Sequence, residues 1–292
     1  MRAFESVHPA AAFAYFISVL LVAMFTAHPV LLCEALLGAV LFCAILSAKG
    51  FWKNMASYVP LFAIIALSNP LFSHNGVTML FFLNGNPVTL EAVLYGADIA
   101  VMLIAVIYWF QCYSFVMTSD KFLYLFGKAI PKLSLVLSMA LRFIPLFKAQ
   151  LIRVNRAQKA MGLYSGKSFT DKLRSAGRVL LALITWSLEN AVETGDSMRA
   201  RGYGLHGRSH FALFRFTGRD GVLLGISAAL TGLTLTGRAL GGADFAFYPR
   251  ITGISTAPLS LAVYLAFGAL TLLPFIIETE ESLKWTYFVS KI

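Results

Sequence analysis

Residues 147–162 read FKAQLIRVNRAQKAMG, and this stretch decides how the middle of the chain folds. On a helix with about 100° between residues, one narrow stripe is apolar except for a glutamine. The stripe holds Phe147, Leu151, Val154, Gln158 and Met161. The opposite side carries Lys148, Arg153, Arg156 and Lys159. The stretch predicts an amphipathic helix that ends near Gly162, because glycine readily takes the left-handed conformation that closes a helix.

A second amphipathic helix is predicted from about Thr170 to Arg201, ending at Gly202. Its apolar face holds Leu180, Ile184, Leu188 and Ala191. Its polar face holds Arg178, Glu189, Glu193 and Asp196. The middle of the chain is therefore expected to form a pair of long amphipathic helices.

The ends of the two predicted helices resemble each other, forty residues apart. The first reads Gln158-Lys159-Ala160-Met161-Gly162-Leu163, and the second reads Met198-Arg199-Ala200-Arg201-Gly202-Tyr203. Each finishes in a small residue, a long residue and glycine, with cations in the last turn, where the helix dipole favours them. Ordinary capping would explain one such end. Two in one block, each closing an amphipathic helix, are more than capping usually gives.

Both helices lie in one basic interval, residues 114–216, which carries the whole excess charge of the protein. Its sixteen cations are Lys121, Lys128, Lys132, Arg142, Lys148, Arg153, Arg156, Lys159, Lys167, Lys172, Arg174, Arg178, Arg199, Arg201, Arg208 and Arg215. Its five acids are Asp120, Asp171, Glu189, Glu193 and Asp196. Under the positive-inside rule such a block stays in the cytoplasm. It is too large for a turn between spans, so we expect a partner on that side of the membrane to bind it.

The composition of the chain is that of a membrane protein. It is 58% hydrophobic and 13% charged, with a mean hydropathy of +0.74, whereas soluble domains carry roughly 25% charge. A pI near 9.6 can point to nucleic acid, but no soluble domain is expected here that could form a groove for it. The start of the chain has no pattern of a cleaved signal peptide. We therefore predict a polytopic membrane protein that contacts the lipid bilayer and binds no nucleic acid.

Six segments are long and apolar enough to be predicted as spans. They are Ala10–Thr26, Val30–Ser47, Tyr58–Phe72, Ala92–Tyr113, Gly221–Thr236 and Pro258–Ile277. Lys49 and Lys53 follow the second span, whereas the loop 73–91 has no Lys or Arg. The N-terminus, the basic block and the C-terminus are therefore expected in the cytoplasm. Leu133–Phe147 is apolar but short and carries Arg142, which indicates a segment lying partly in the membrane.

The predicted fold class is an all-α membrane protein, with about six transmembrane helices and a cytoplasmic pair of long amphipathic helices. The expected regions are 1–113, with about four spans, then 114–217, which holds the amphipathic pair, and 218–292, with about two spans. In the outer loop, Val77–Leu83 and Val88–Leu90 flank Asn84-Gly85-Asn86-Pro87. This pattern fits a short β-hairpin and an irregular loop equally well.

Three further stretches, together with the paired helix ends, resemble a known family. They read Asn69-Pro70-Leu71-Phe72-Ser73-His74-Asn75-Gly76, Thr118-Ser119-Asp120-Lys121-Phe122 and Leu141-Arg142-Phe143-Ile144-Pro145. The combination is similar to the transmembrane T component (EcfT, CbiQ-like) of energy-coupling factor transporters, a branch of the ABC importers. The resemblance covers the chain from about Asn69 to Arg208.

The resemblance implies a non-catalytic scaffold without cofactor or metal, in the plasma membrane of a prokaryote. Its implied partners are two ABC-type ATPase subunits and a substrate-binding membrane S component, which together import a vitamin or a transition-metal ion. The implied coupling residues are Ala160, Met161, Gly162, Ala200, Arg201 and Gly202, supported by the basic residues Arg153, Arg156, Lys159 and Arg199. The first end departs from the family pattern because Met161 replaces an arginine. Lys159 and Arg156 are the candidate substitutes.

Other motifs predict little chemistry. Gly162–Ser168 looks like a P-loop but has three residues between its glycines where the motif needs four. His206 and His210 have the spacing of metal ligands but lie in a glycine-rich stretch. Glu278, Glu280 and Glu281 form an acidic cluster that is expected to be solvated.

One acidic residue, Asp98, leaves a second hypothesis for the function open. Asp98 lies well inside a predicted span, where a charge is costly. It could form a hydrogen bond between helices or lie near the outer interface. It could also be the ion-coupling residue of a self-sufficient secondary transporter. Inverted repeats would favour that second function, and we find none in the sequence.

Overall fold

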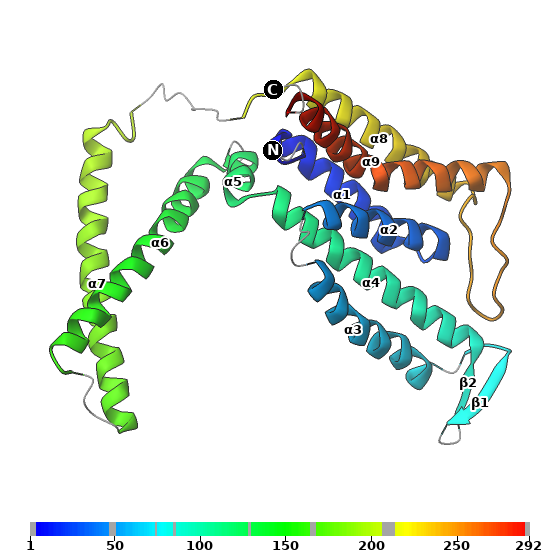
Figure 1. The fold of residues 1–292 in the computed structure, drawn as a ribbon, viewed down its shortest axis with the longest axis horizontal. Helices are drawn as coiled ribbons and strands as arrows, with labels where there is room; N and C mark the ends of the chain where they lie inside the picture. The colour runs from blue at the N-terminus through cyan, green and yellow to red at the C-terminus, as the bar shows by residue number, and fades with distance from the viewer. Residues whose placement is uncertain are drawn as a thin grey trace. The chain divides into compact units, whose positions relative to one another are not determined.

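A computed structural model describes residues 4–46, 51–73, 75–83, 86–127, 130–163, 168–205 and 214–289. These residues form nine α-helices, one short 3-10 helix and a two-stranded sheet. The chain divides into two compact units (Figure 1). Unit 1 comprises Met1–Phe122 and Phe214–Ile292, and unit 2 comprises Leu123–Leu213. The predicted all-α membrane class is confirmed.

Unit 1 is a bundle of apolar helices. Its elements are η1 (Phe4–Ser6), α1 (Pro9–Phe25), α2 (Pro29–Leu46), α3 (Phe51–Phe72), α4 (Leu90–Val116), α8 (Gly218–Ala239) and α9 (Pro258–Val289). Helix α4 packs against α1, α2 and α3, while α9 packs against α2 and α8. Helix α5 (Ser119–Gly127) begins in unit 1 and ends in unit 2.

Six helices are long and apolar enough to cross a membrane among the residues described, as many as predicted, but the set differs. Helix α1 has only 17 residues, one turn less than a typical span requires. In its place stands the 30-residue helix α6 (Pro131–Ala160). From the sequence, this helix was predicted as two separate segments, because its first half is apolar and its second half is amphipathic. The structure joins Leu133–Phe147 and the predicted amphipathic helix into one.

Aromatic side chains fill the core of unit 1. Phe4, Phe16, Phe42 and Trp109 are almost completely buried, and their rings meet mainly edge to face. Trp109 donates its indole N–H to the carbonyl of Ala35 at 3.0 Å, which satisfies a polar group that would be costly to bury unpaired. Glycine allows close approach elsewhere: a Cβ at Gly96 would lie 2.6 Å from the carbonyl oxygen of Ala66, so α3 and α4 touch along their backbones.

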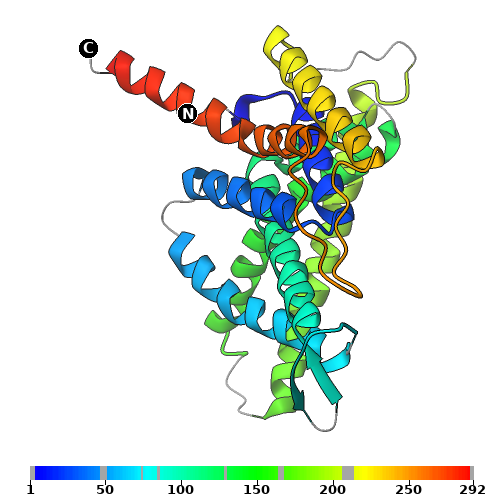
Figure 2. The same ribbon diagram turned by 90° about the vertical axis from the view of Figure 1, so that its right-hand side faces the viewer.

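The loop between α3 and α4 forms a hairpin, which decides between the two alternatives left by the sequence. Strands β1 (Met79–Leu83) and β2 (Asn86–Thr89) pair antiparallel at the end of α3 and α4 (Figure 2). Glu91, at the start of α4, accepts from the hydroxyl of Thr78 at 2.8 Å and from its backbone N–H. This acid therefore fastens the hairpin to α4.

A short N-terminal segment, Phe4–His8, forms what we call the strap. The buried ammonium of Lys121, in α5, donates to the carbonyls of Glu5 and, at 2.9 Å, Val116. Burial lowers the pKa of this ammonium. The backbone N–H of His8 donates to Asp220 at the start of α8, at 2.9 Å. The strap thus fastens the last residues before unit 2 and the first residues after it.

The strap also corrects one prediction. Glu278 is only 6% exposed and accepts from the backbone N–H of Phe4 at 3.0 Å. The expectation that the whole acidic cluster is solvated is wrong for this residue. Its partner lies 274 residues away, so no local pattern could reveal it.

Candidate functional site

Unit 2 consists mainly of two long helices that run antiparallel, α6 and α7 (Phe169–Ala200). The rings of Phe147 in α6 and Trp186 in α7 meet edge to face, with centroids 5.4 Å apart. The C-terminal end of α6 lies against the first turns of α7, and the C-terminal end of α7 lies beside the first half of α6. The two helix ends singled out by the sequence therefore lie at opposite ends of one helical pair.

Both ends have the same backbone geometry. At the first end, Gly162 has φ +71°, and Leu163 donates its N–H to the carbonyl of Gln158 at 3.1 Å. At the second end, Gly202 has φ +80°, and Tyr203 donates its N–H to the carbonyl of Met198 at 3.0 Å. These are Schellman motifs, in which glycine supplies the left-handed residue. The predicted stops at Gly162 and Gly202 are confirmed.

The surroundings of the first end are closed. The carbonyl of Leu163 accepts from the hydroxyl of Ser175 at 3.1 Å and from the guanidinium of Arg178 at 3.2 Å, and both donors lie on α7. Arg178 also donates to Ser175 at 2.9 Å. Gln158, the one polar residue of the apolar stripe, is buried. Met161 remains 65% exposed at the tip. The turn after α6 is therefore fixed to α7 by an arginine that the sequence had placed only on a polar face.

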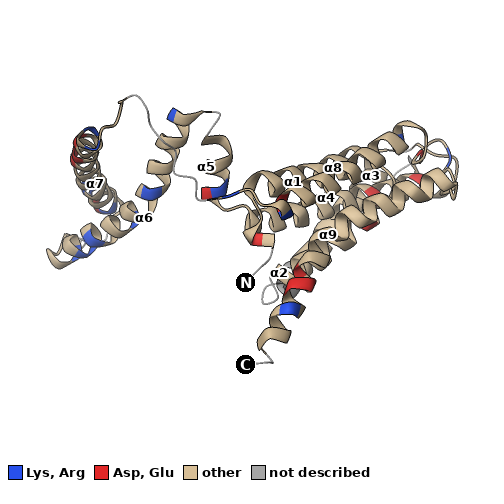
Figure 3. Cartoon of the chain, turned by 90° about the horizontal axis from the view of Figure 1, so that it is seen from above, with Lys and Arg blue, Asp and Glu red and all other residues tan. Residues whose placement is uncertain are grey.

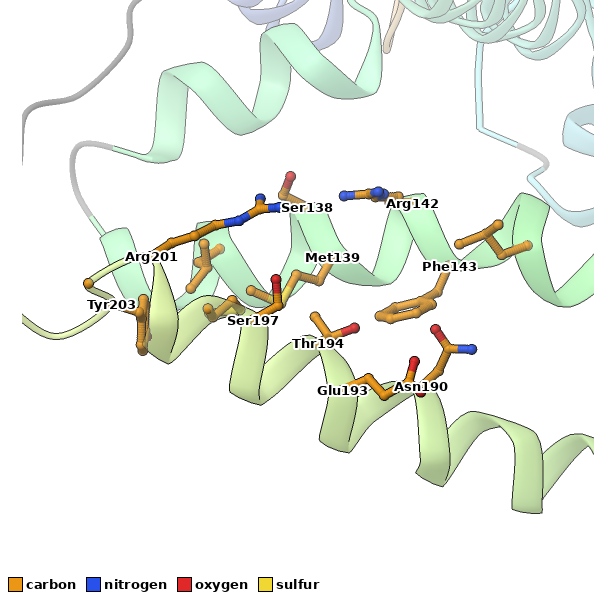
Figure 4. A pocket seen from close by; sticks show the side chains of 14 residues that line it. Ser138, Met139, Arg142, Phe143, Asn190, Glu193, Thr194, Ser197, Arg201 and Tyr203 are labelled. Atoms are coloured by element: carbon orange, nitrogen blue, oxygen red, sulfur yellow. The ribbon is translucent and has the colours of Figure 1, made fainter.

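The surroundings of the second end are open. A groove of about 730 Å³ separates the first half of α6 from the last turns of α7 (Figure 4). Its lining is Leu135, Ser138, Met139, Arg142, Phe143, Leu146, Asn190, Glu193, Thr194, Ser197, Met198, Arg201, Gly202 and Tyr203. In Figure 4, Arg142 from α6 and Arg201 from α7 extend toward each other along one side of the groove. The second end thus presents two guanidinium groups, although its motif contains only one of them.

No ion pair forms among the residues of unit 2 that the structure describes. Lys284 and Glu280, in α9, form the one Lys or Arg ion pair found across the described ranges. In Figure 3 the ribbons of α6 and α7 carry several blue segments, which mark Lys and Arg, with some red on α7, whereas the helices of unit 1 are mostly tan. Arg201, Arg199, Lys159, Arg156 and Arg153 are all exposed. They are free to meet charges on another molecule.

The apolar face of α7 is also uncovered. Leu180 is 59% exposed, Ile184 47% and Leu188 63%, and these three residues were predicted to share one face. A contiguous apolar surface of this kind marks a protein or membrane contact. Together with the cations at the helix ends, it indicates that α6 and α7 are built to be covered by something else.

Comparison with known proteins matches residues 1–213 to the model of a family, CbiQ, described as cobalt transport protein. The chain belongs to this family. With six apolar helices in its described part, it is a multi-pass membrane protein.

Several curated relatives of this CbiQ-family chain are named energy-coupling factor transporter transmembrane protein EcfT. One from Lacticaseibacillus paracasei is 35% identical over 112 residues, which are 38% of this chain and 42% of the relative. One from Listeria innocua is 34% identical over 106 residues, 36% of this chain and 40% of the relative. The chain thus spans about two fifths of the length of the curated relatives it matches.

The other candidate residues of this CbiQ-family chain gain little from the structure. Within the described ranges, no cluster of three or more His, Cys, Asp or Glu could hold a metal ion. His206 and His210, and residues 164–167 of the P-loop-like stretch, lie outside those ranges. Asp98 is 8% exposed in α4, and its carboxylate has no hydrogen bond to any residue described. The hydrogen bond between helices, one of the alternatives for Asp98, is therefore not formed with any described residue.

Sequence reasoning missed Arg142 and Arg178 as members of the two ends. Both lie on the helix opposite the end that they approach. A helical wheel treats each helix alone, so it cannot show contacts across the pair. The available signal was Arg142 inside an otherwise apolar stretch, where a charge requires a partner or an exit to water.

Proposed function

We propose that this chain is the non-catalytic transmembrane component of an energy-coupling factor importer. Unit 1 would lie in the membrane, and unit 2 would pass the work of two ABC-type ATPase subunits to a separate membrane subunit that binds the substrate. The substrate class would be a micronutrient, either a vitamin or a transition-metal ion. The family description and the names of the EcfT relatives support this proposal.

The observation that carries the proposal is the pair of like-shaped helix ends at opposite ends of α6 and α7. Both have the same left-handed glycine and the same pattern of backbone hydrogen bonds, and exposed cations lie in the last turns before each glycine. Two similar tips facing opposite ways suit two similar partners, such as a pair of ATPase subunits. We propose Ala160, Met161 and Gly162 as the contact for one subunit, and Ala200, Arg201 and Gly202 for the other.

Charge supports the same assignment. Arginine presents a rigid fork of donors that fits a carboxylate, and it keeps its charge under all physiological conditions. Arg201 offers such a fork at the second tip, and Arg153, Arg156, Lys159 and Arg199 supply the surrounding positive field. At the first tip Met161 offers apolar surface in place of a charge. The cations near it are Lys159, Arg156 and Arg178, and the last of these is already hydrogen-bonded to Leu163 and Ser175. The two contacts are therefore expected to differ in strength.

The membrane arrangement is part of the proposal. The positive-inside rule favours a cytoplasmic location for unit 2, and with it cytoplasmic N- and C-termini. Residues 1–113 and 218–292 would be membrane regions, and 114–217 the coupling region. The uncovered apolar face of α7 supports a contact with the substrate-binding S component.

The test is ATP-driven uptake into vesicles that contain the chain and its co-purified partners. Right-side-out vesicles with internal ATP would be offered labelled cobalt ion and a panel of labelled vitamins, with and without an uncoupler. We expect uptake that needs ATP and survives the uncoupler. Co-purification in mild detergent should yield two ATPase subunits and one further small membrane protein. A chain that copurifies with no ATPase would refute the proposal.

A secondary transporter that uses Asp98 is the second candidate, supported by the burial of Asp98 without a hydrogen bond to any described residue. It predicts uptake that stops when the proton gradient collapses at constant ATP. It also predicts a dead Asp98→Asn variant, because an amide cannot titrate. Under the first proposal, Asp98→Asn retains most of the uptake.

A further inference from the structure

We propose that the groove between α6 and α7 binds one carboxylate of the partner ATPase, held jointly by Arg142 and Arg201. The inference rests on the proposed function, which supplies the partner. It adds a second arginine, from the opposite helix, to the site at the second end. It also fixes the chemistry of the occupant as an acidic side chain flanked by apolar ones.

The charge of the groove is the first step. Arg142 and Arg201 point toward each other from two helices (Figure 4). No Asp or Glu oxygen in the described part of the chain lies within 4.0 Å of either guanidinium. Two like charges held on one side of a groove repel each other, and an anion between them relieves that repulsion. A carboxylate has two oxygens, so each guanidinium can donate to one of them.

The lining of the groove is the second step. Met139 and Phe143 lie on its α6 wall together with Leu135 and Leu146, whereas Ser197 and Thr194 lie on its α7 wall. Apolar side chains beside two arginines suit a protein segment in which an acid is flanked by hydrophobic residues. Glu193 also lines the groove. Its negative charge disfavours a phosphate dianion more strongly than a singly charged carboxylate.

The first helix end lacks the pair of available arginines that the groove at the second end provides. There the arginine from the opposite helix, Arg178, already donates to the carbonyl of Leu163 and the hydroxyl of Ser175. The position that corresponds to Arg201 is occupied by Met161, which has no charge. At the second end, Arg142 has no such bond to any described residue and Arg201 is present. Of the two ends, the second is therefore the one at which two guanidinium groups without a bond to any described residue can bind the same anion.

The test is a double-mutant cycle on the full chain in detergent, with the purified ATPase subunits as ligand. The variants Arg142→Gln, Arg201→Gln and the double variant are each prepared, and the Kd of each for the ATPase subunits is measured by titration. Each single change should weaken binding about tenfold or more, because a charge-assisted bond is lost at a desolvated contact. The double change should weaken binding far less than the product of the two, because both arginines hold the same carboxylate.

The matched control is Lys148→Gln, which removes a positive charge from an exposed position on the same helix outside the groove. It should leave Kd within about twofold of the wild type, since exposed charges contribute little. Size-exclusion profile and Tm of every variant must match the wild type. The Arg142→Lys variant should recover part of the loss.

Each other outcome has a defined meaning. If Arg142→Gln behaves like Lys148→Gln while Arg201→Gln weakens binding, the shared receptor is refuted and the coupling proposal stands. Multiplicative effects in the double variant would place the two arginines on separate anions, which also refutes it. If Arg142→Gln leaves ATPase binding intact but lowers binding to inorganic phosphate or to vesicles of anionic phospholipid, the occupant is a phosphate group and the proposal fails. A wild-type chain that binds no ATPase defeats the proposed function itself.

Discussion

The two ends of the helical pair share one backbone and differ in everything around it. At Gly162 the turn is fixed to α7 by Ser175 and Arg178, and an apolar Met161 forms the tip. At Gly202 the turn borders an open groove that holds Arg142 and Arg201. A duplicated motif in the sequence therefore became one closed and one open site. Function is expected to follow the surroundings of the motif more than the motif itself.

Unit 1 shows that a helix end closed by a left-handed glycine does not by itself identify a functional site. Helix α8 also ends in this way: Gly241 has φ +83°, and Gly242 donates its N–H to the carbonyl of Gly237 at 2.8 Å. That end closes a helix of unit 1. This third end shows that the same turn also closes a helix outside the basic interval, so two such turns do not by themselves exceed ordinary capping. What separates the two ends of unit 2 from it is the exposed cations of α6 and α7.

The largest effect is expected from Arg201→Glu, which reverses the charge at the open end. Attraction for a partner carboxylate becomes repulsion, so ATP-driven uptake should fall below about a tenth of the wild-type rate, as expected when a buried charge pair is broken. Lys148→Glu makes the same charge change at an exposed position of α6 that lies outside the groove and away from both helix ends. It should retain most of the activity. Wild-type uptake in Arg201→Glu would remove the main support for the coupling proposal.

A direct comparison of the ends comes next, with Arg201→Ala against Met161→Ala. The first change removes charge-assisted donors, whereas the second removes only apolar contact at a tip that is 65% exposed in the free chain. Uptake should fall clearly less in Met161→Ala than in Arg201→Ala. Equal or larger damage at Met161 would mean that apolar contact, and not charge, anchors both ends.

The closed end can be opened by Arg178→Met. The change removes the guanidinium bonds to Leu163 and Ser175 while keeping an unbranched side chain. We expect faster amide exchange over 158–163 and a loss of about 1 kcal/mol in local stability, typical of one net hydrogen bond. Exchange over 198–203 should not change. Arg174→Met, four residues earlier, is the control, and equal effects of the two variants would contradict the contact.

The smallest effect is expected from Lys167→Ala. The P-loop-like stretch has the wrong spacing between its glycines, so the lysine should not bind phosphate. The isolated chain should show no ATP binding, and uptake by the variant should be nearly unchanged. A measurable nucleotide affinity that this substitution abolishes would show that the rejected motif is real.

The sequence predicted well wherever one residue decides a local outcome. Gly162 and Gly202 set the two helix stops because few other residues take a positive φ without strain. It predicted poorly wherever the outcome depends on distant residues. The start of α6 at Pro131 was missed because the apolar half of the helix resembles a membrane segment. The roles of Arg142, Arg178 and Glu278 depend on how separate helices meet, and no periodicity within one helix records that.

The strap gives the molecule a mechanical property that no single helix has. Unit 2 is tethered by two covalent connections, one just after Lys121 and one just before Phe214. The strap is bonded to Lys121 on the first side and to Asp220 on the second, and to Glu278 of α9 besides. Because hydrogen bonds join the strap to both connections, a displacement of either one would act on the strap as well as on the helix that continues it, α4 or α8. The same five residues thus link the start of α5, the start of α8 and the glutamate of α9 at one place in unit 1.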